Sequence, residues 1–166
     1  SSTSTTVSLG AHLDVTNNVA FLNGGGLYFQ EGSSFDCSGN GSSVLIDRNT
    51  AQYGGGIMDS QKKTTLSKSI TILSGSKFEV TNNVATVSGG GLSLRNSARL
   101  DVTGSNTRLF VKNNTARDSG GGIALKSGAV VRVTSPSIFY GNEVLRGSGG
   151  ALSYDGDGGS NNGGSN

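Results

Sequence analysis

The sequence predicts a right-handed parallel β-helix, or β-solenoid, of roughly five coils. One pattern occurs five times: a large apolar residue lies three positions before an Asn, a small residue usually follows that Asn by two positions, and a glycine run then precedes an apolar segment. The marker Asn residues are 31, 34, 31 and 28 residues apart, and a period of about 20 to 50 residues indicates stacked repeats. Each repeat holds three short apolar segments and no helical periodicity, which favours strands.

The composition agrees with a stacked architecture. The chain of 166 residues has 28 Gly, one Pro, no Trp and 33% hydrophobic residues, which are poor ingredients for an ordinary globular core. A solenoid escapes this limit because each repeat buries its apolar face against its neighbours. The net charge is +2 with scattered basic residues, which excludes a nucleic-acid groove. No apolar run approaches the roughly 20 residues of a membrane span, so we expect no membrane insertion by this segment.

The elements follow in chain order. Residues 1–6 are a polar lead-in, and residues 7–154 form the β-helix, in which residues 7–9 are the remains of an incomplete coil. The first strand of each coil is exemplified by Leu13-Asp14-Val15, whose alternation is typical of a half-buried strand. Residues 155–166, rich in Gly, Ser and Asn, are a flexible tail or linker.

Each coil is expected to contain three strands. The first strand covers residues 13–15, 44–46, 78–80, 109–111 and 138–139. The second follows the glycine run, at residues 27–29, 57–59, 92–94, 123–125 and 152–154. The third lies between those two, at residues 35–37, 70–72, 100–102 and 131–133.

Two corners separate these strands. Asn tolerates a left-handed backbone and can hydrogen-bond stacked neighbours, which predicts a structural ladder of Asn18, Asn49, Asn83, Asn114 and Asn142. The next corner needs positive φ and close backbone approach, which glycine allows. The corner glycines are Gly24, Gly25, Gly26, Gly54, Gly55, Gly56, Gly89, Gly90, Gly91, Gly120, Gly121, Gly122, Gly149 and Gly150. They are not a phosphate loop, because no helix follows and no Lys-Ser or Lys-Thr pair completes that motif.

The last repeat carries a family resemblance. It contains Phe139-Tyr140-Gly141-Asn142 and Gly149-Gly150-Ala151-Leu152. An FxxN tetrapeptide followed by GGA and an aliphatic residue resembles the repeat of the polymorphic membrane proteins, autotransporter-like surface proteins known from chlamydiae. The first four copies depart from it, with Val or Ile for Phe and a third Gly for Ala. The resemblance covers residues 13–154 and implies an exported, often adhesive, β-helix on a cell surface.

Catalysis is the rival interpretation, because some β-helices cleave acidic polysaccharides with clustered carboxylates, Ca²⁺ and a nearby basic residue. Asp36, Thr71, Asp101 and Arg132 form an outward column at about 4.8 Å per coil. Asp36 and Asp101 are then about two strand spacings apart, too far for one metal shell. Asp101 beside Arg132 is better explained as an exposed ion pair. We therefore expect no catalytic residues, no metal site and no cofactor.

Nucleophilic catalysis has weaker support. His12, the only His, lies near the start of the chain, and Cys37 occupies an inward position that Ile72, Val102 and Val133 take in other coils. Cys37 is expected to be a small core residue, with a reactive or cross-linking thiol as the alternative.

Two sets of residues are candidates for contacts. Asp59 replaces an apolar residue, and the polar run 60–65 after it lengthens the second coil. Within that run, Gln61, Lys62 and Lys63 form either a contact loop or a tolerated insertion. Leu45, Phe110 and Tyr140 point outward, where they either contact a neighbouring chain or module or are isolated exposed residues.

These observations favour a non-catalytic extracellular β-solenoid segment of a larger cell-surface protein, acting as a rigid structural or adhesive scaffold. The alternatives are a subunit of an extracellular filament or sheath, built by lateral or end-to-end packing, and a polysaccharide lyase or hydrolase. The expected partners are other coils or modules of the same long protein, other copies of the chain, or surface and matrix components.

Overall fold

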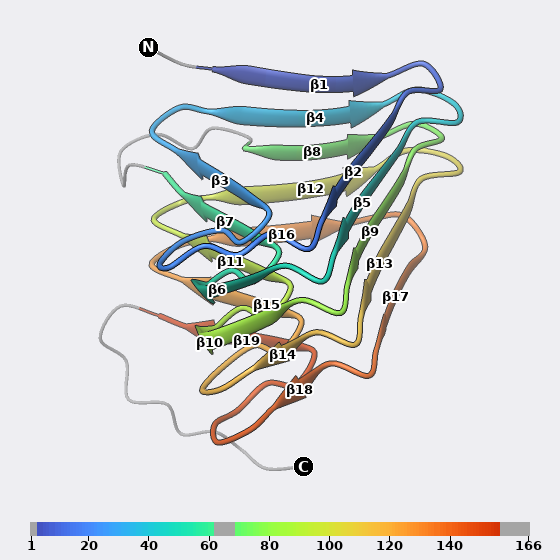
Figure 1. Cartoon of the computed structure of the whole chain (residues 1–166). Helices are drawn as coiled ribbons and strands as arrows, with labels where there is room; N and C mark the ends of the chain where they lie inside the picture. Colours follow the sequence, from blue (N-terminus) through green and yellow to red (C-terminus); the bar gives the residue numbers. More distant parts are fainter. Residues whose placement is uncertain (1–2, 62–68, 157–166) are drawn as a thin grey trace.

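The computed structural model describes residues 3–61 and 69–156. In this part the chain forms 19 β-strands and no helix, and every strand pairing is parallel. The strands stack in sheets along one axis, as Figure 1 shows. The predicted parallel β-helix of about five turns is therefore confirmed.

The strands form four sheets. Sheet A contains β1 (Ser4–Ser8), β4 (Ser34–Ser38), β8 (Ile70–Leu73), β12 (Arg99–Thr103) and β16 (Val130–Val133). Sheet B contains β2 (His12–Thr16), β5 (Ser43–Asp47), β9 (Lys77–Thr81), β13 (Arg108–Lys112) and β17 (Ser137–Tyr140). Sheet C contains β6 (Thr50–Tyr53), β10 (Val84–Ser88), β14 (Thr115–Ala116) and β18 (Glu143–Val144). Sheet D contains β3 (Leu27–Gln30), β7 (Ile57–Ser60), β11 (Leu92–Arg95), β15 (Ile123–Lys126) and β19 (Leu152–Asp155).

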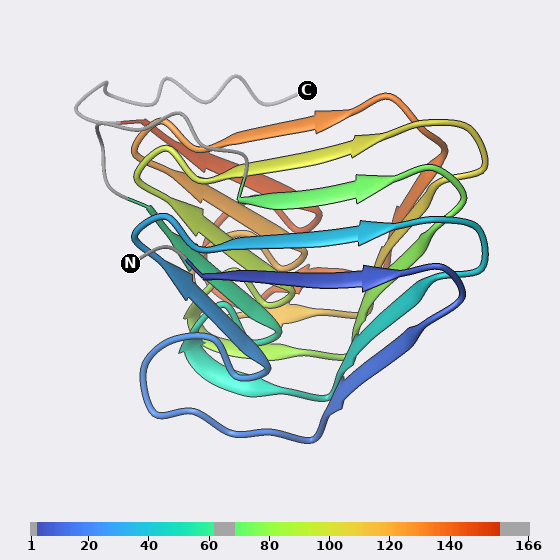
Figure 2. The same ribbon diagram turned by 90° about the horizontal axis from the view of Figure 1, so that it is seen from above.

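The hydrophobic core runs down the middle of the stack. Its buried residues come from sheets A, B and D and the turns between them, and Figure 2 shows these sheets enclosing the interior. Phe35 and Phe78 meet there edge to face, with ring centroids 6.0 Å apart. Period-two alternation produces this core, because it directs every second side chain of each strand inward.

The boundaries of the β-helix differ from those predicted. The expected lead-in, residues 1–6, already contains the start of β1, which pairs with β4 from Ser4 opposite Ser34 to Ser8 opposite Ser38. Val7 of β1 is buried and packs in the hydrophobic core, whereas the other residues of this strand are polar. At the other end, Asp155 belongs to β19, and residues 157–166 of the predicted tail lie outside the described residues.

Sheet C is a fourth set of short strands that the three-strand prediction lacks. Its strands directly follow the marker Asn residues, and Ala51, Ala85 and Ala116 are buried and paired in register. Sheet C lies against the outer face of sheet D, where the guanidinium of Arg95 is 4.0 Å from the ring centroid of Tyr53. The small residue two positions after Asn49, Asn83 and Asn114 therefore occupies a buried position of sheet C.

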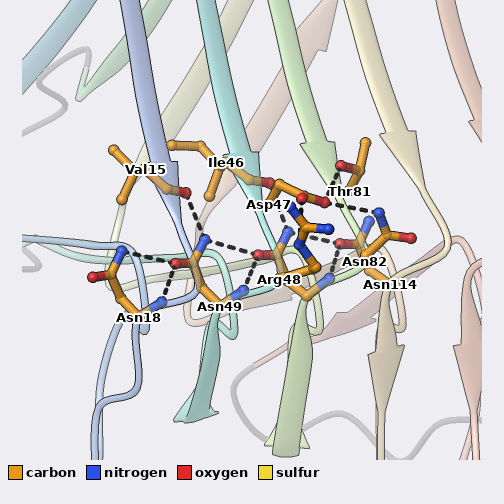
Figure 3. A network of polar contacts seen from close by, with 10 residues as sticks. Val15, Asn18, Ile46, Asp47, Arg48, Asn49, Thr81, Asn82 and Asn114 are labelled. Atoms are coloured by element: carbon orange, nitrogen blue, oxygen red, sulfur yellow. Dashed lines mark hydrogen bonds and ion pairs between the residues drawn. The ribbon is translucent and has the colours of Figure 1, made fainter.

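The five marker Asn residues form one continuous ladder, of which Figure 3 shows the part from Asn18 to Asn114. The side-chain oxygens of Asn49, Asn83, Asn114 and Asn142 each accept two hydrogen bonds, from the backbone N–H and the side-chain amide of the preceding Asn, at 2.9 to 3.1 Å. The second amide hydrogen donates to a backbone carbonyl of the preceding coil at 2.8 to 2.9 Å. Asn49, Asn83 and Asn114 are fully buried, and their side chains use all four hydrogen-bonding positions.

The left-handed backbone at this corner belongs to a different residue from the one expected. Positive φ occurs one position before each marker, as at Asn82 with φ of 55° and Asn113 with φ of 53°. Arg48 takes this position in the second coil with φ of 53°, and its guanidinium contacts the Asp47 carboxylate at 2.9 Å. The marker Asn is therefore selected for its hydrogen bonds, and its predecessor supplies the turn.

The glycine corner has two separate requirements, illustrated by the third coil. Gly89 has φ of 70°, which L side chains rarely adopt. Gly90 has no positive φ, but a Cβ there would lie 2.5 Å from the carbonyl oxygen of Thr115 and 2.6 Å from its carbon. The first glycine thus makes the turn, and the second allows the neighbouring coil to stack.

Candidate interaction surface

The outer face of sheet B carries an apolar pocket between β13 and β17. Phe110 and Ile138 are register partners on these strands, and both side chains point away from the core. They line a cavity of about 190 Å³ together with Arg108 and Pro136, and we call it the β13–β17 pocket. Ile138 and the nearby Tyr140 are 48% and 55% exposed.

Besides Arg108, which lines the pocket, two lysines lie near its aromatic residues. The ammonium of Lys112 lies 4.4 Å from the ring centroid of Phe110 and 5.9 Å from that of Tyr140, and Lys77 lies 5.6 Å from the Phe110 ring. Such contacts attract a cation to the face of an aromatic ring. The result is an aromatic surface bordered by positive charge.

The one carboxylate in this cluster is already shared. Glu79, the register neighbour of Phe110 on β9, contacts Lys77 at 2.7 Å and Lys112 at 3.5 Å. Arg108 is exposed and forms no ion pair with any residue that the structure describes. Three cations therefore face one carboxylate, which leaves a local excess of positive charge.

The three predicted outward contact residues do not form one patch. Phe110 and Tyr140 lie on neighbouring strands, whereas Leu45 on β5 is separated from Phe110 by Glu79. Ile138, which the prediction omitted, completes the apolar surface. The alternation of the last first-strand segment indicates that Ile138 points outward. Its place beside Phe110 follows only once the register of the shorter last coil is known.

The proposed contact loop needs a correction at Gln61. This side chain is 2% exposed, donates to the Asp59 carboxylate at 2.6 Å, and accepts the backbone N–H of Gly32 at 2.8 Å. Gln61 is therefore a buried link between two coils, and the prediction that it makes external contacts is wrong. Lys62 and Lys63 lie outside the described residues.

Asp59 is an ionisable group inside the core. It lies between Phe29 and Leu94 in the register of sheet D and is fully buried. Burial raises the pKa of its carboxyl group, and the hydrogen bond from Gln61 opposes this effect. Its Oδ2 atom has no hydrogen-bond partner among the described residues, which adds to the cost of burying the charged form.

The outward column considered for catalysis is spaced as expected but paired differently. Thr71 lies between Asp36 and Asp101 in register, so the two carboxylates are not adjacent. Asp101 is 3% exposed and pairs with Arg99 of its own strand at 2.8 Å. The predicted exposed Asp101–Arg132 ion pair is therefore wrong, because Asp101 is buried and its ion-pair partner is Arg99 on the same strand, β12. No group of three or more potential His, Cys, Asp or Glu ligands gathers within residues 3–61 and 69–156.

The two candidates for nucleophilic chemistry are apart in the fold. The His12 ring contacts the Ser43 hydroxyl at 2.6 Å on the exposed side of sheet B. Cys37 is fully buried in sheet A between Val7 and Ile72 in register, as the inward prediction requires. Burial raises the pKa of the Cys37 thiol, which disfavours the reactive thiolate.

No family model, curated protein or solved structure matches this chain. The resemblance to polymorphic membrane protein repeats thus rests on the FxxN and GGA motifs alone. The described part of the chain also has no helix with the length and hydropathy to span a membrane.

Proposed function

We propose that this chain is a rigid, non-catalytic β-solenoid scaffold in a larger cell-surface protein, and that it presents the outer face of sheet B to an extracellular partner. The observation that carries the proposal is the unbroken Asn ladder, which joins five consecutive coils.

Rigidity follows from how each coil is fixed to the next. Neighbouring coils share the parallel pairing of sheets A, B and D along with the buried ladder bonds. Bending the stack would open hydrogen bonds in a water-poor interior, where unsatisfied polar groups are costly. Such a stack keeps its surface groups at fixed separations, which suits presentation to a partner.

Presentation outside a cell is supported by two features. The FxxN and GGA motifs resemble repeats of exported proteins, and the apolar residues Phe110, Ile138 and Tyr140 gather on one face. Exposed apolar clusters of this kind mark interaction sites more often than isolated exposed residues do.

Location is tested by immunogold electron microscopy of intact source cells, with an antibody raised against residues 77–112. We expect label on the outer envelope before permeabilisation. Label that appears only after permeabilisation would overturn the surface assignment. Patchy surface label would favour an adhesin.

A filament subunit is the second candidate, and the ladder gives it specific support. At one edge of the described coils Asn18 Oδ1 accepts no ladder bond, and at the other the Asn142 amide lacks a ladder acceptor. One further coil at each end, from this or another chain, would continue the ladder. Regular immunogold spacing along a filament would favour this role, and a monomeric chain in light scattering at high concentration would contradict self-assembly.

A further inference from the structure

The size of the β13–β17 pocket limits what it can bind. At about 190 Å³ it is smaller than the roughly 300 to 1,000 Å³ of pockets that enclose a small molecule. It opens on the face of sheet B, so a ligand that fills it can continue along the surface. These dimensions suit one unit of a polymer.

The chemistry of the lining points to an anionic unit with an apolar face. Phe110, Ile138 and Pro136 provide a largely apolar floor, and Arg108 stands at its border without an ion-pair partner among the described residues. A guanidinium holds a carboxylate through two parallel hydrogen bonds. Glu79 does not compete for it, because its oxygens contact Lys77 and Lys112.

The position of the pocket argues against an extended peptide. Peptides that bind sheets commonly add a strand at a free edge and use backbone hydrogen bonds. This pocket instead lies on the sheet face between β13 and β17, whose backbones pair with each other. β17 is the outermost described strand of sheet B, so a peptide added at its free edge would lie beside the pocket, whereas a ligand inside the pocket is held by side chains. A uronate ring offers C–H groups for Phe110 and a carboxylate for Arg108.

We propose that the β13–β17 pocket binds a uronate unit of an acidic polysaccharide, with the sugar ring against Phe110 and Ile138 and the carboxylate on Arg108. This inference rests on the proposed function, because it requires this face to be exposed outside the cell. It names the partner class for the presented surface and involves no bond cleavage.

The test is calorimetric titration of the full chain with trigalacturonate, using neutral maltotriose and tetraglutamate as reference ligands. We expect trigalacturonate to bind more tightly than either reference. Arg108→Gln and Phe110→Ser should each weaken binding at least about tenfold. Arg132→Gln is the matched control, because it removes the same charge from an exposed position on sheet A.

Three results would overturn the proposal: no binding of trigalacturonate at millimolar concentration, equal loss in the Arg108→Gln and Arg132→Gln variants, or equal binding of tetraglutamate. Circular dichroism on every variant separates lost binding from lost folding. Release of unsaturated uronate products would contradict a purely binding role. Surface label on cells without uronate binding would refute only the pocket, whereas binding without surface label would refute only the cell-surface role.

Discussion

Substituting Asn114 by Ala tests the ladder at one of its fully buried positions. The Asn114 side chain accepts from the backbone N–H and the amide of Asn83 at 3.0 and 2.9 Å, and donates to Val80 O and Asn142 Oδ1 at 2.9 and 3.0 Å. Removing it leaves two donors of the fully buried Asn83 unpaired. Each buried unsatisfied group costs about 1 to 3 kcal/mol, so the free energy of unfolding should fall by about 2 to 6 kcal/mol.

Two controls separate the ladder from general effects of substitution. Asn18→Ala removes one ladder bond at 3.0 Å, yet Asn49 Oδ1 keeps the bond from the Asn18 backbone, so the loss should be about 1 kcal/mol. Ser93→Ala lies in a central coil, and the buried Ser93 hydroxyl has no hydrogen-bond partner within residues 3–61 and 69–156. That substitution should be neutral or stabilising, because it removes an unsatisfied polar group.

The assay is urea unfolding followed by far-ultraviolet circular dichroism, with the slope of the transition compared between variants. An Asn114→Ala loss no larger than the Asn18→Ala loss would refute the ladder as a source of stability. An equal loss in Ser93→Ala would show instead that any change in the central coils is damaging.

Three further predictions concern other buried positions. Gly90→Ala should prevent folding or cost several kcal/mol, because a Cβ there meets the Thr115 backbone. Gly128→Ala is the control: nothing lies nearer than 3.9 Å to its Cβ, so it should cost about 1 kcal/mol from the positive φ alone. Equal melting temperatures of the two variants would contradict this prediction. The pKa of Asp59 is raised above 3.8 in the folded state, so the folded state binds the carboxyl proton more tightly than the unfolded state does. Proton binding by Asp59 should therefore stabilise the fold fully below about pH 4, and this stabilisation should be lost as pH rises through the folded pKa. Asp59→Asn should make the free energy of unfolding, measured by urea titration, depend less on pH between about pH 4 and pH 7. Parallel pH profiles of the variant and the original chain would contradict this prediction. Cys37 should react with iodoacetamide only after denaturation, since its thiol is buried; rapid labelling of the folded chain would show an open core.

The three main strands of each coil can be predicted because their alternation repeats in register. Val44, Phe78 and Leu109 occupy one inward column, and the sequence places each of them five residues before a marker Asn. Such local signals do not require knowledge of what covers the outer face.

Sheet C escapes prediction because its strands lack a clear apolar alternation. Thr50–Tyr53 contains one small buried residue, Ala51, and its partner surface is the outer face of sheet D. The same cover explains why Met58 and Ser93 are buried although alternation directs them outward. Strand periodicity indicates which residues share a face, but it does not show that a second sheet covers that face.

The candidate site is only partly predictable for the same reason. Phe110 and Tyr140 stand out as apolar residues at outward positions, but the pocket also needs Pro136, which lies in a turn outside any strand pattern. Gln61 is polar in a polar run, and only the fold shows that its amide is used inside, beside Asp59. Asp101 likewise pairs along its own strand with Arg99, a choice that depends on burial.

The ladder also bears on how such a chain can evolve. The same hydrogen-bond pattern joins Asn residues that are 28, 31 or 34 residues apart, so differences in length are absorbed in the loops. Unequal recombination between repeats would insert or delete a whole coil with its own Asn and glycine corner. Each such event would change the length of the stack by about 4.8 Å and leave the remaining coils in register. The number of repeats in a gene can therefore set how far a distant site projects, independently of the chemistry of that site.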